Sequence, residues 1–121
     1  LSLQGSCFMS TLENYWNWEL CDETMGNWGN QGIEVALATW LTGHRVLVNH
    51  NTWYAHMFRT QGGDFGFPWE ASGRDMQKTK SKVVDKYWNH KHPKQIHSVK
   101  WLLEKFWPVQ GWTEEQLLKL K

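Results

Sequence analysis

The sequence predicts an α/β protein in which short strands are followed by C-terminal helices. Residues 1–9, 44–49 and 53–59 show alternation or β-branched and aromatic side chains, which are typical of strands. The other segments carry helix caps or apolar residues at helical spacing. A sheet of three short strands leaves its edges exposed and one face poorly covered. We therefore expect a short mixed sheet that forms the second half of a larger α/β sheet.

The first strand is expected to lead directly into a helix. Residues 1–9 contain Gly5, which would permit another backbone or a ligand to approach the strand closely. Ser10 and Glu13 have the spacing of a capping box, in which each residue satisfies a backbone amide of the other. This spacing predicts a helix over about residues 11–20.

A loop and a second helix follow. Residues 21–32 are rich in glycine and asparagine, which predicts a loop. The helix after it has four apolar residues on one face: Ile33, Leu37, Trp40 and Leu41. Gly43 is a suitable residue beyond the last turn, because glycine adopts the left-handed backbone conformation at no steric cost. We expect this helix to be buried on one side.

The second half of the chain is predicted to contain a loop and three helices. Residues 60–73 combine four glycines and a proline with aromatic side chains, as do loops that close over ligands. The next helix carries an apolar stripe made of Met76, Val83, Val84 and Tyr87. Pro93 is expected to begin a further helix that ends near Phe106. Thr113 and Gln116 predict a capped last helix.

Composition and charge narrow the class of protein. No run approaches the roughly 18 apolar residues that a membrane-spanning helix needs. Cys7 and Cys21 show no metal or redox spacing, so we expect reduced thiols and a cytoplasmic location. Residues 1–58 hold one basic and five acidic residues, a net charge of −4, and residues 59–121 hold twelve and seven, a net charge of +5. A basic part of this kind can meet phosphate groups.

Three stretches together resemble a known family of enzymes: residues 5–10 (GSCFMS), 21–43 and 51–59 (NTWYAHMFR). They are similar to the C-terminal half of GT-A fold (nucleotide-diphospho-sugar transferase) glycosyltransferases, namely the bacterial and phage members of family 2 and the related polypeptide N-acetylgalactosaminyltransferases. That group has an Asp-containing loop, a Trp-Gly-Gly-Glu-Asn-x-Glu segment, a helix ending in Trp-x-x-Gly-Gly, and a His-x-Phe-Arg motif. The corresponding residues here are Asp22, Trp28, Gly29, Glu34, Trp40, Gly43, His56, Phe58 and Arg59.

The resemblance implies transfer of a sugar from a nucleotide donor, such as a UDP-sugar, to a hydroxyl acceptor on a saccharide or polypeptide. It implies that His56 binds a divalent metal, Mn²⁺ or alternatively Mg²⁺, which neutralises the diphosphate. Glu34 and Asp22 would be the catalytic groups on the sugar and acceptor side, and Trp28 with the loop 61–69 would exclude water. The implied nucleotide and substrate contacts are Trp28, Gly29, Gln31, Arg59 and Phe65, of which Arg59 would contact the diphosphate.

Two departures from the family limit the implied mechanism. Inverting members have Glu-Asp where this chain has Gln31 and Gly32, so their general base is missing here. The retaining N-acetylgalactosaminyl relatives have Glu-Asn at this place and also lack the base, so the chain is more similar to them. Alternatively, Glu34 or Asp22 takes over as the base. No Asp-x-Asp or Asp-x-His motif occurs in the 121 residues. The chain is therefore expected to be half of a site, inactive alone, and completed by an N-terminal half in the same polypeptide or in another chain.

Within this half, we expect residues 1–70 to form the C-terminal part of the catalytic domain, including the lid loop. Residues 71–121 are expected to form a helical extension that packs on it.

Four other interpretations of these residues compete with the family resemblance. His56 could be a buried core residue, since a single histidine among aromatic side chains is more often buried than metal-bound. The lysines within 78–105 alternate with tryptophans and histidines as in nucleic-acid-binding modules, but carboxylates interrupt them and a solvated helix surface is the better interpretation. His90, His92 and His97 could bind Zn²⁺, although their spacing matches no strong motif. The tryptophans could form a carbohydrate-binding surface.

Overall fold

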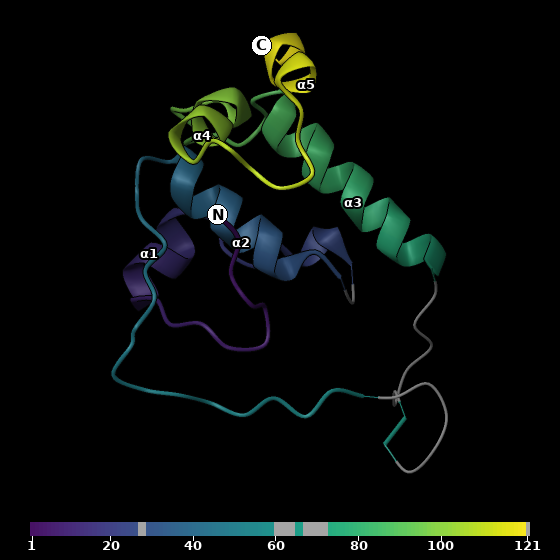
Figure 1. The fold of residues 1–121 in the computed structure, drawn as a ribbon. Coiled ribbons are helices and arrows are strands. Elements are labelled where there is room, and N and C mark those ends of the chain that lie inside the picture. The colour runs from purple at the N-terminus through teal and green to yellow at the C-terminus, as the bar shows by residue number, and fades with distance from the viewer. Residues whose placement is uncertain (27–28, 60–64, 67–72, 121) are drawn as a thin grey trace.

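A computed structural model of the chain describes residues 1–26, 29–59, 65–66 and 73–120. This part of the chain is helical (Figure 1). Its elements are α1 (Leu12–Asn17), the 3₁₀ helix η1 (Glu23–Met25), α2 (Gln31–Leu41), α3 (Gly73–Trp88), α4 (Val99–Lys105) and α5 (Glu114–Lys119). None of these helices combines the length and the apolar character that crossing a bilayer needs.

The predicted α/β fold is wrong, because the described residues contain no β-strand. They form an all-helical arrangement in place of a GT-A half-domain with a short mixed sheet. Residues 44–59, which we call the arm, run extended beneath the helices in Figure 1. From 45 to 58 no backbone amide of the arm bonds to another backbone group of the described chain. A strand needs the ladder of a neighbouring strand, and within the described residues the arm has none.

Helix α2 lies at the centre of the hydrophobic core. All residues from Glu34 to Leu41 are buried, so the prediction that this helix is buried on one side is wrong. Its first turn reaches the surface, where Ile33 is 46% exposed. The surrounding core residues come from the region after α1 and from α3 and α4: Leu20, Val83, Tyr87, Val99, Leu102 and Leu103. Both halves of the sequence therefore contribute to one core.

Helix α3 contacts the rest of the fold along a line of residues four positions apart. Thr79, Val83 and Tyr87 are buried, whereas Met76 and Val84 of the predicted stripe are largely exposed. The Thr79 hydroxyl donates a hydrogen bond of 2.6 Å to the carbonyl oxygen of Met25. This bond joins α3 to the end of η1 and fixes the helix beside the loop that precedes α2.

The C-terminal helices begin at polar caps. Helix α4 begins after Ser98, whose hydroxyl accepts a hydrogen bond from the Trp101 amide, and not at Pro93 as predicted. The amide of Ile96 donates to the carbonyl oxygen of Leu41 at 2.8 Å, so the turn before α4 packs on the end of α2. The capping box predicted for the last helix is confirmed, since Thr113 and Gln116 satisfy each other's amides.

The N-terminal segment packs on the first turn of α2 through two glycines. A Cβ at Gly5 would lie 3.0 Å from the Gly32 nitrogen, which confirms the predicted close approach at Gly5. A Cβ at Gly32 would collide with the carbonyl oxygen of Leu3. At the other end of α2, Gly43 has a φ of +87°, as predicted for the residue beyond the last turn.

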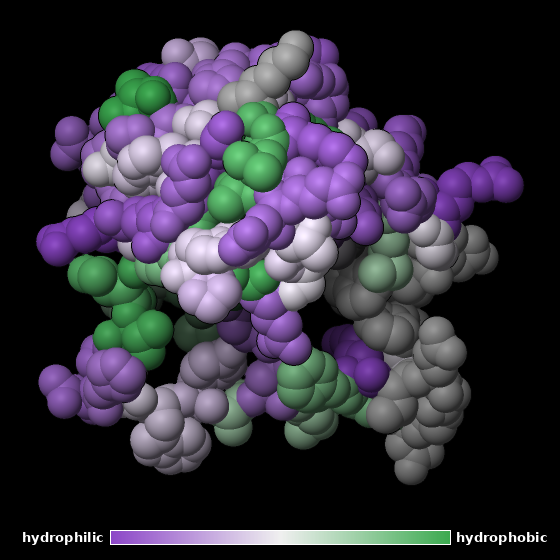
Figure 2. Space-filling model, turned by 45° about the horizontal axis from the view of Figure 1, so that its top comes forward, coloured by the Kyte–Doolittle hydropathy of each residue, from purple (hydrophilic) through white to green (hydrophobic). Residues whose placement is uncertain are grey.

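The arm exposes most of its apolar side chains. Trp53 is 86% and Leu47 is 74% exposed, and Val48, Met57 and Phe58 are also exposed. Elsewhere, Figure 2 shows hydrophobic residues in small patches among hydrophilic ones on one face of the helical body. Tyr54 joins the arm to the N-terminal segment, because its hydroxyl lies 3.2 Å from that of Ser6.

Candidate functional site

A cavity of about 680 Å³ opens beside the first turn of α2. Its walls come from the N-terminal segment, the end of α1, the loop through η1, α2, the arm and α3. Five of the residues that the sequence assigns to a site line it: Asp22, Gly29, Gln31, Glu34 and His56. Segments more than 30 residues apart in the sequence thus meet at one cavity.

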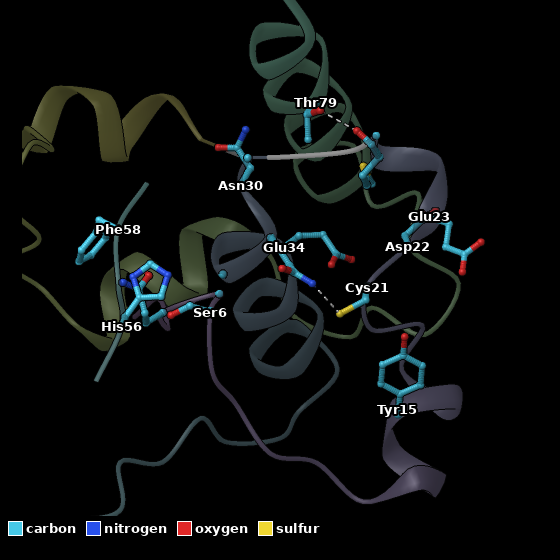
Figure 3. Close-up of a pocket in the computed structure, with 17 residues that line it drawn as sticks. Ser6, Tyr15, Cys21, Asp22, Glu23, Asn30, Glu34, His56, Phe58 and Thr79 are labelled. Carbon is cyan, nitrogen blue, oxygen red and sulfur yellow. Dashed lines mark hydrogen bonds between the residues drawn. The ribbon is translucent and has the colours of Figure 1, made fainter. Parts of the chain in front are cut away.

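The cavity has an imidazole side and a carboxyl side. Figure 3 shows His56, Phe58 and Ser6 on one side of the first turn of α2, and Asp22 with Glu23 on the other. His56 is exposed and its ring meets the Phe58 ring edge to face, with 4.2 Å between centroids. His56 is therefore a residue of the cavity wall in this structure and not a core residue.

Glu34 is the buried acid of the cavity. It is 2% exposed, and Tyr87 of α3 donates a hydrogen bond of 3.1 Å to its Oε1. Burial raises the pKa of Glu34, while the bond from Tyr87 and the charge of Lys86 act in the opposite direction without cancelling the effect. A carboxyl whose pKa is raised can exchange a proton nearer to neutral pH than an ordinary glutamate does.

Asp22 is an anchor of the loop. Asp22 caps η1, because its Oδ1 accepts hydrogen bonds from the amide and the hydroxyl of Thr24. Its Oδ2 lies 2.8 Å from Nζ of Lys86. Partial burial acts to raise the pKa of Asp22, but the bonds from Lys86 and Thr24 outweigh it and lower the pKa to about 2. Such a carboxylate is a weak base with few free lone pairs.

The remaining loop residues shape the entrance. The side-chain amide of Gln31 donates to the sulfur of Cys21 at 3.2 Å, which closes the loop against the start of α2. Gly29 has a φ of +95°, a conformation that favours glycine. Gly32 is required by the carbonyl oxygen of Leu3, because any side chain at this position would collide with it.

The predicted diphosphate and lid residues lie elsewhere or outside the described chain. Arg59 and Phe65 do not line the cavity, and the guanidinium lies over the Phe65 ring, 4.5 Å from its centroid. Arg59 also donates to the carbonyl oxygen of Gly66 at 2.8 Å. Trp28 and most of the loop 61–69 fall outside the described residues.

Four residues of the site have no motif that marks them in the sequence: Tyr15, Cys21, Lys86 and Tyr87. Tyr15 and Cys21 line the cavity, and Lys86 and Tyr87 hold its two acids. The sequence places Tyr87 in the apolar stripe of α3. Its phenol, which needs a partner when the ring is buried, is the signal that could have distinguished it from the other members of the stripe.

The potential metal ligands are dispersed. Among the residues that the structure describes, no three His, Cys, Asp or Glu side chains come close enough to hold a metal ion. His56 can therefore supply one ligand, and the described chain offers no complete set around it. The same result disfavours zinc at His90, His92 and His97, since His92 is buried with its Nε2 3.1 Å from the carbonyl oxygen of Trp18.

Comparisons of the chain with protein-family models, with curated proteins and with solved structures found no match.

Proposed function

We propose that the chain forms part of a glycosyltransferase and that the cavity binds the sugar-bearing end of a nucleotide donor. The observation that supports this most strongly is the meeting of Asp22, Gly29, Gln31, Glu34 and His56 at one cavity. The resemblance to glycosyltransferases assigns all five residues to one site, although they come from a loop, a helix and the arm.

The chemistry of the cavity suits a sugar. Carboxyl, amide and hydroxyl groups line it together with the rings of Tyr15 and Phe58. Sugars combine hydroxyl groups with apolar ring faces, and such ligands bind where a few polar groups and aromatic surfaces converge. The volume lies within the range of about 300–1,000 Å³ that small-molecule sites occupy.

In this proposal His56 is one ligand of a divalent cation, Mn²⁺ or Mg²⁺. Its exposed imidazole on the cavity wall fits that role, and the other ligands would come from the donor diphosphate and from carboxylates of a partner segment or chain. When bound, such a cation neutralises the diphosphate leaving group. The remaining chemistry belongs to the side chains of the cavity.

Of the two acids, Glu34 is the better candidate to handle the proton of an acceptor hydroxyl. Its pKa is raised by burial, whereas the ion pair and the cap hold Asp22 as a charged group with a pKa of about 2. A general base is most effective when its pKa is close to the working pH. We therefore propose Glu34 as the acid–base group and Asp22 as the anchor of the loop.

Calorimetric titration of UDP and of UDP-sugars, with and without Mn²⁺, tests this proposal. The wild-type chain should bind more tightly with Mn²⁺, and His56→Ala should remove that gain. His50→Ala is the matched control, because His50 is also an exposed histidine of the arm but does not line the cavity. Binding that ignores Mn²⁺, or equal loss in both variants, would contradict the proposal. Binding of free sugar without the nucleotide would favour a carbohydrate-binding module.

A further inference from the structure

Two adjacent residues of α3 hold two of the acids that line the cavity, Asp22 and Glu34. Nζ of Lys86 lies 2.8 Å from Oδ2 of Asp22, and the phenol of Tyr87 lies 3.1 Å from Oε1 of Glu34. Successive residues of a helix point about 100° apart, so one turn of α3 reaches two different carboxyl groups. Helix α3 lies within residues 71–121, which we expected to form a helical extension that packs on the catalytic domain.

The two acids are held in different ways. Asp22 already accepts three hydrogen bonds, two from Thr24 and one from Lys86, and so has little capacity left for a ligand. Glu34 accepts a hydrogen bond from Tyr87 at Oε1, the backbone of Cys21 also acts to lower its pKa, and Glu34 lines the cavity. Glu34 is therefore the acid with capacity left to meet a hydroxyl or amide group of a ligand.

Tyr87 is suited to fixing the orientation of another group. It is fully buried in the core, and its ring stacks on the His92 ring with 5.7 Å between centroids. It does not line the cavity, so it acts on a ligand only through Glu34. Because packing holds the ring, the hydroxyl is presented to Glu34 at a fixed place without further loss of conformational entropy.

We infer that Tyr87 is a positioning residue, which holds the Glu34 carboxyl toward the sugar in the cavity while Lys86 ties Asp22 to the loop. The inference rests on the proposed function of this cavity. It adds α3 to the site and assigns the recognition of a sugar hydroxyl or amide to Glu34 in preference to Asp22.

The ionisation of Glu34 provides a measurement that needs no ligand. The titratable groups that act on Glu34 are Tyr87 and Lys86 of α3, Asp22 of the loop and Tyr15 of α1, and the backbone of Cys21 also lowers its pKa. We would follow the carboxyl carbon of Glu34 by NMR as the pH is raised. The pKa should lie above the ordinary glutamate value, and Tyr87→Phe, which removes the hydroxyl and keeps the ring, should raise it further. An unchanged titration would overturn the inference.

A second measurement follows ligand binding. It uses UDP and four UDP-sugars: UDP-glucose, UDP-galactose and their two N-acetylamino counterparts, all with Mn²⁺. Tyr87→Phe should weaken binding of the preferred UDP-sugar by about tenfold and leave UDP unchanged, since one hydrogen bond to a charged or polar group is worth about 1–1.5 kcal/mol. Ser81→Ala is the control, because it removes a hydroxyl of the same helix that bonds to the carbonyl oxygen of Gln77 within α3 and does not line the cavity.

The outcomes separate the two proposals. A wild-type chain that binds a UDP-sugar, with Tyr87→Phe binding it equally well, overturns the positioning role and leaves the proposed function intact. A wild-type chain that binds none of the ligands overturns both. A loss that is equal for UDP and for the UDP-sugar shows general damage to the cavity and also contradicts the positioning role.

Discussion

The two sides of the cavity are built in different ways. On the carboxyl side, Glu34 is held by Tyr87, a core residue of α3, and Asp22 by the neighbouring Lys86. On the imidazole side, His56 lies on the arm. The arm contacts the body through the Tyr54–Ser6 bond and the partly buried Val46, and it makes no backbone ladder from 45 to 58 with the described residues. The first side is fixed by the fold of this chain. The second side leaves its apolar residues exposed, and in our proposal a further segment or chain supplies the other metal ligands.

The largest expected effect is on the free energy of unfolding, and it distinguishes a core residue of α2 from a residue of the arm. Leu41→Ala removes a fully buried side chain of α2 and should lower the free energy of unfolding by about 2–5 kcal/mol. Leu47→Ala removes the same atoms from a side chain of the arm that is 74% exposed, and should change the free energy of unfolding by about 0.5 kcal/mol or less. Urea unfolding followed by circular dichroism measures both. Equal losses would show that the arm is packed in solution.

The next largest effect concerns the contact between the N-terminal segment and the first turn of α2. Gly32→Ala would drive a Cβ against the carbonyl oxygen of Leu3, and should destabilise the chain by about 1–3 kcal/mol and weaken ligand binding. Gly73→Ala is the control, since a Cβ at Gly73 would meet no other part of the described chain within 4 Å. Thermal unfolding distinguishes the two. If Gly32→Ala melts like wild type, the close approach of Leu3 to α2 does not occur.

The ion pair of the carboxyl side should appear in the pH dependence of stability. The pKa of Asp22 lies at about 2 in the folded chain, below its ordinary value of 3.8. The native state therefore gains stability above pH 3.8, and this gain is lost as the pH falls toward 2. Lys86→Met should flatten that loss. At about pH 6 this substitution should lower the free energy of unfolding by about 0.5–3 kcal/mol, which lies between the effects of breaking an exposed and a buried ion pair.

Lys91→Met is the control for this prediction, because Lys91 and Asp85 also form an ion pair at 2.8 Å but both side chains are more than half exposed. We would compare the variants by their midpoints of urea unfolding. These are measured from near-neutral pH down to about pH 2, the pKa of Asp22. If both variants follow the same curve, the Asp22 pair does not stabilise the loop.

The smallest effect tests the attachment of the arm. Tyr54→Phe removes the 3.2 Å hydrogen bond to Ser6, which is exposed, and should change the free energy of unfolding by about 0.5 kcal/mol or less. It should nevertheless weaken the Mn²⁺-dependent part of UDP binding, because the bond holds the arm two residues before His56. A loss of stability as large as that of Leu41→Ala would contradict the difference between the two sides.

The sequence predicts most of the elements that depend on local signals, although α1 is capped by Thr11 and not by the predicted Ser10 and Glu13. The end of α2 at Gly43 and the capping box of α5 are confirmed, because each depends on residues within one helical turn. Alternation at 44–49 and 53–59 predicts strands, yet pairing depends on a partner that local patterns do not specify. The start of α4 at Ser98 was missed because Pro93 is an equally acceptable first residue on local grounds.

The candidate site shows the same division. Family resemblance selects Glu34 and His56, and the structure brings both to one cavity. Their environments follow from contacts across the chain: Tyr87 lies 53 positions from Glu34, and Lys86 lies 64 positions from Asp22. No motif encodes such pairs, so the roles of the two acids could not be separated from the sequence.

The most direct test of the proposed site uses the paramagnetism of Mn²⁺, which broadens the NMR signals of nearby nuclei. With UDP present, Mn²⁺ should broaden the amide signals of residues around His56 and Phe58 and of the first turn of α2, while Mg²⁺ at the same concentration should not. His56→Ala should abolish the broadening and His50→Ala should preserve it. Broadening centred on His90, His92 and His97, or spread evenly over the chain, would contradict the proposal that the cavity holds a metal-bound nucleotide.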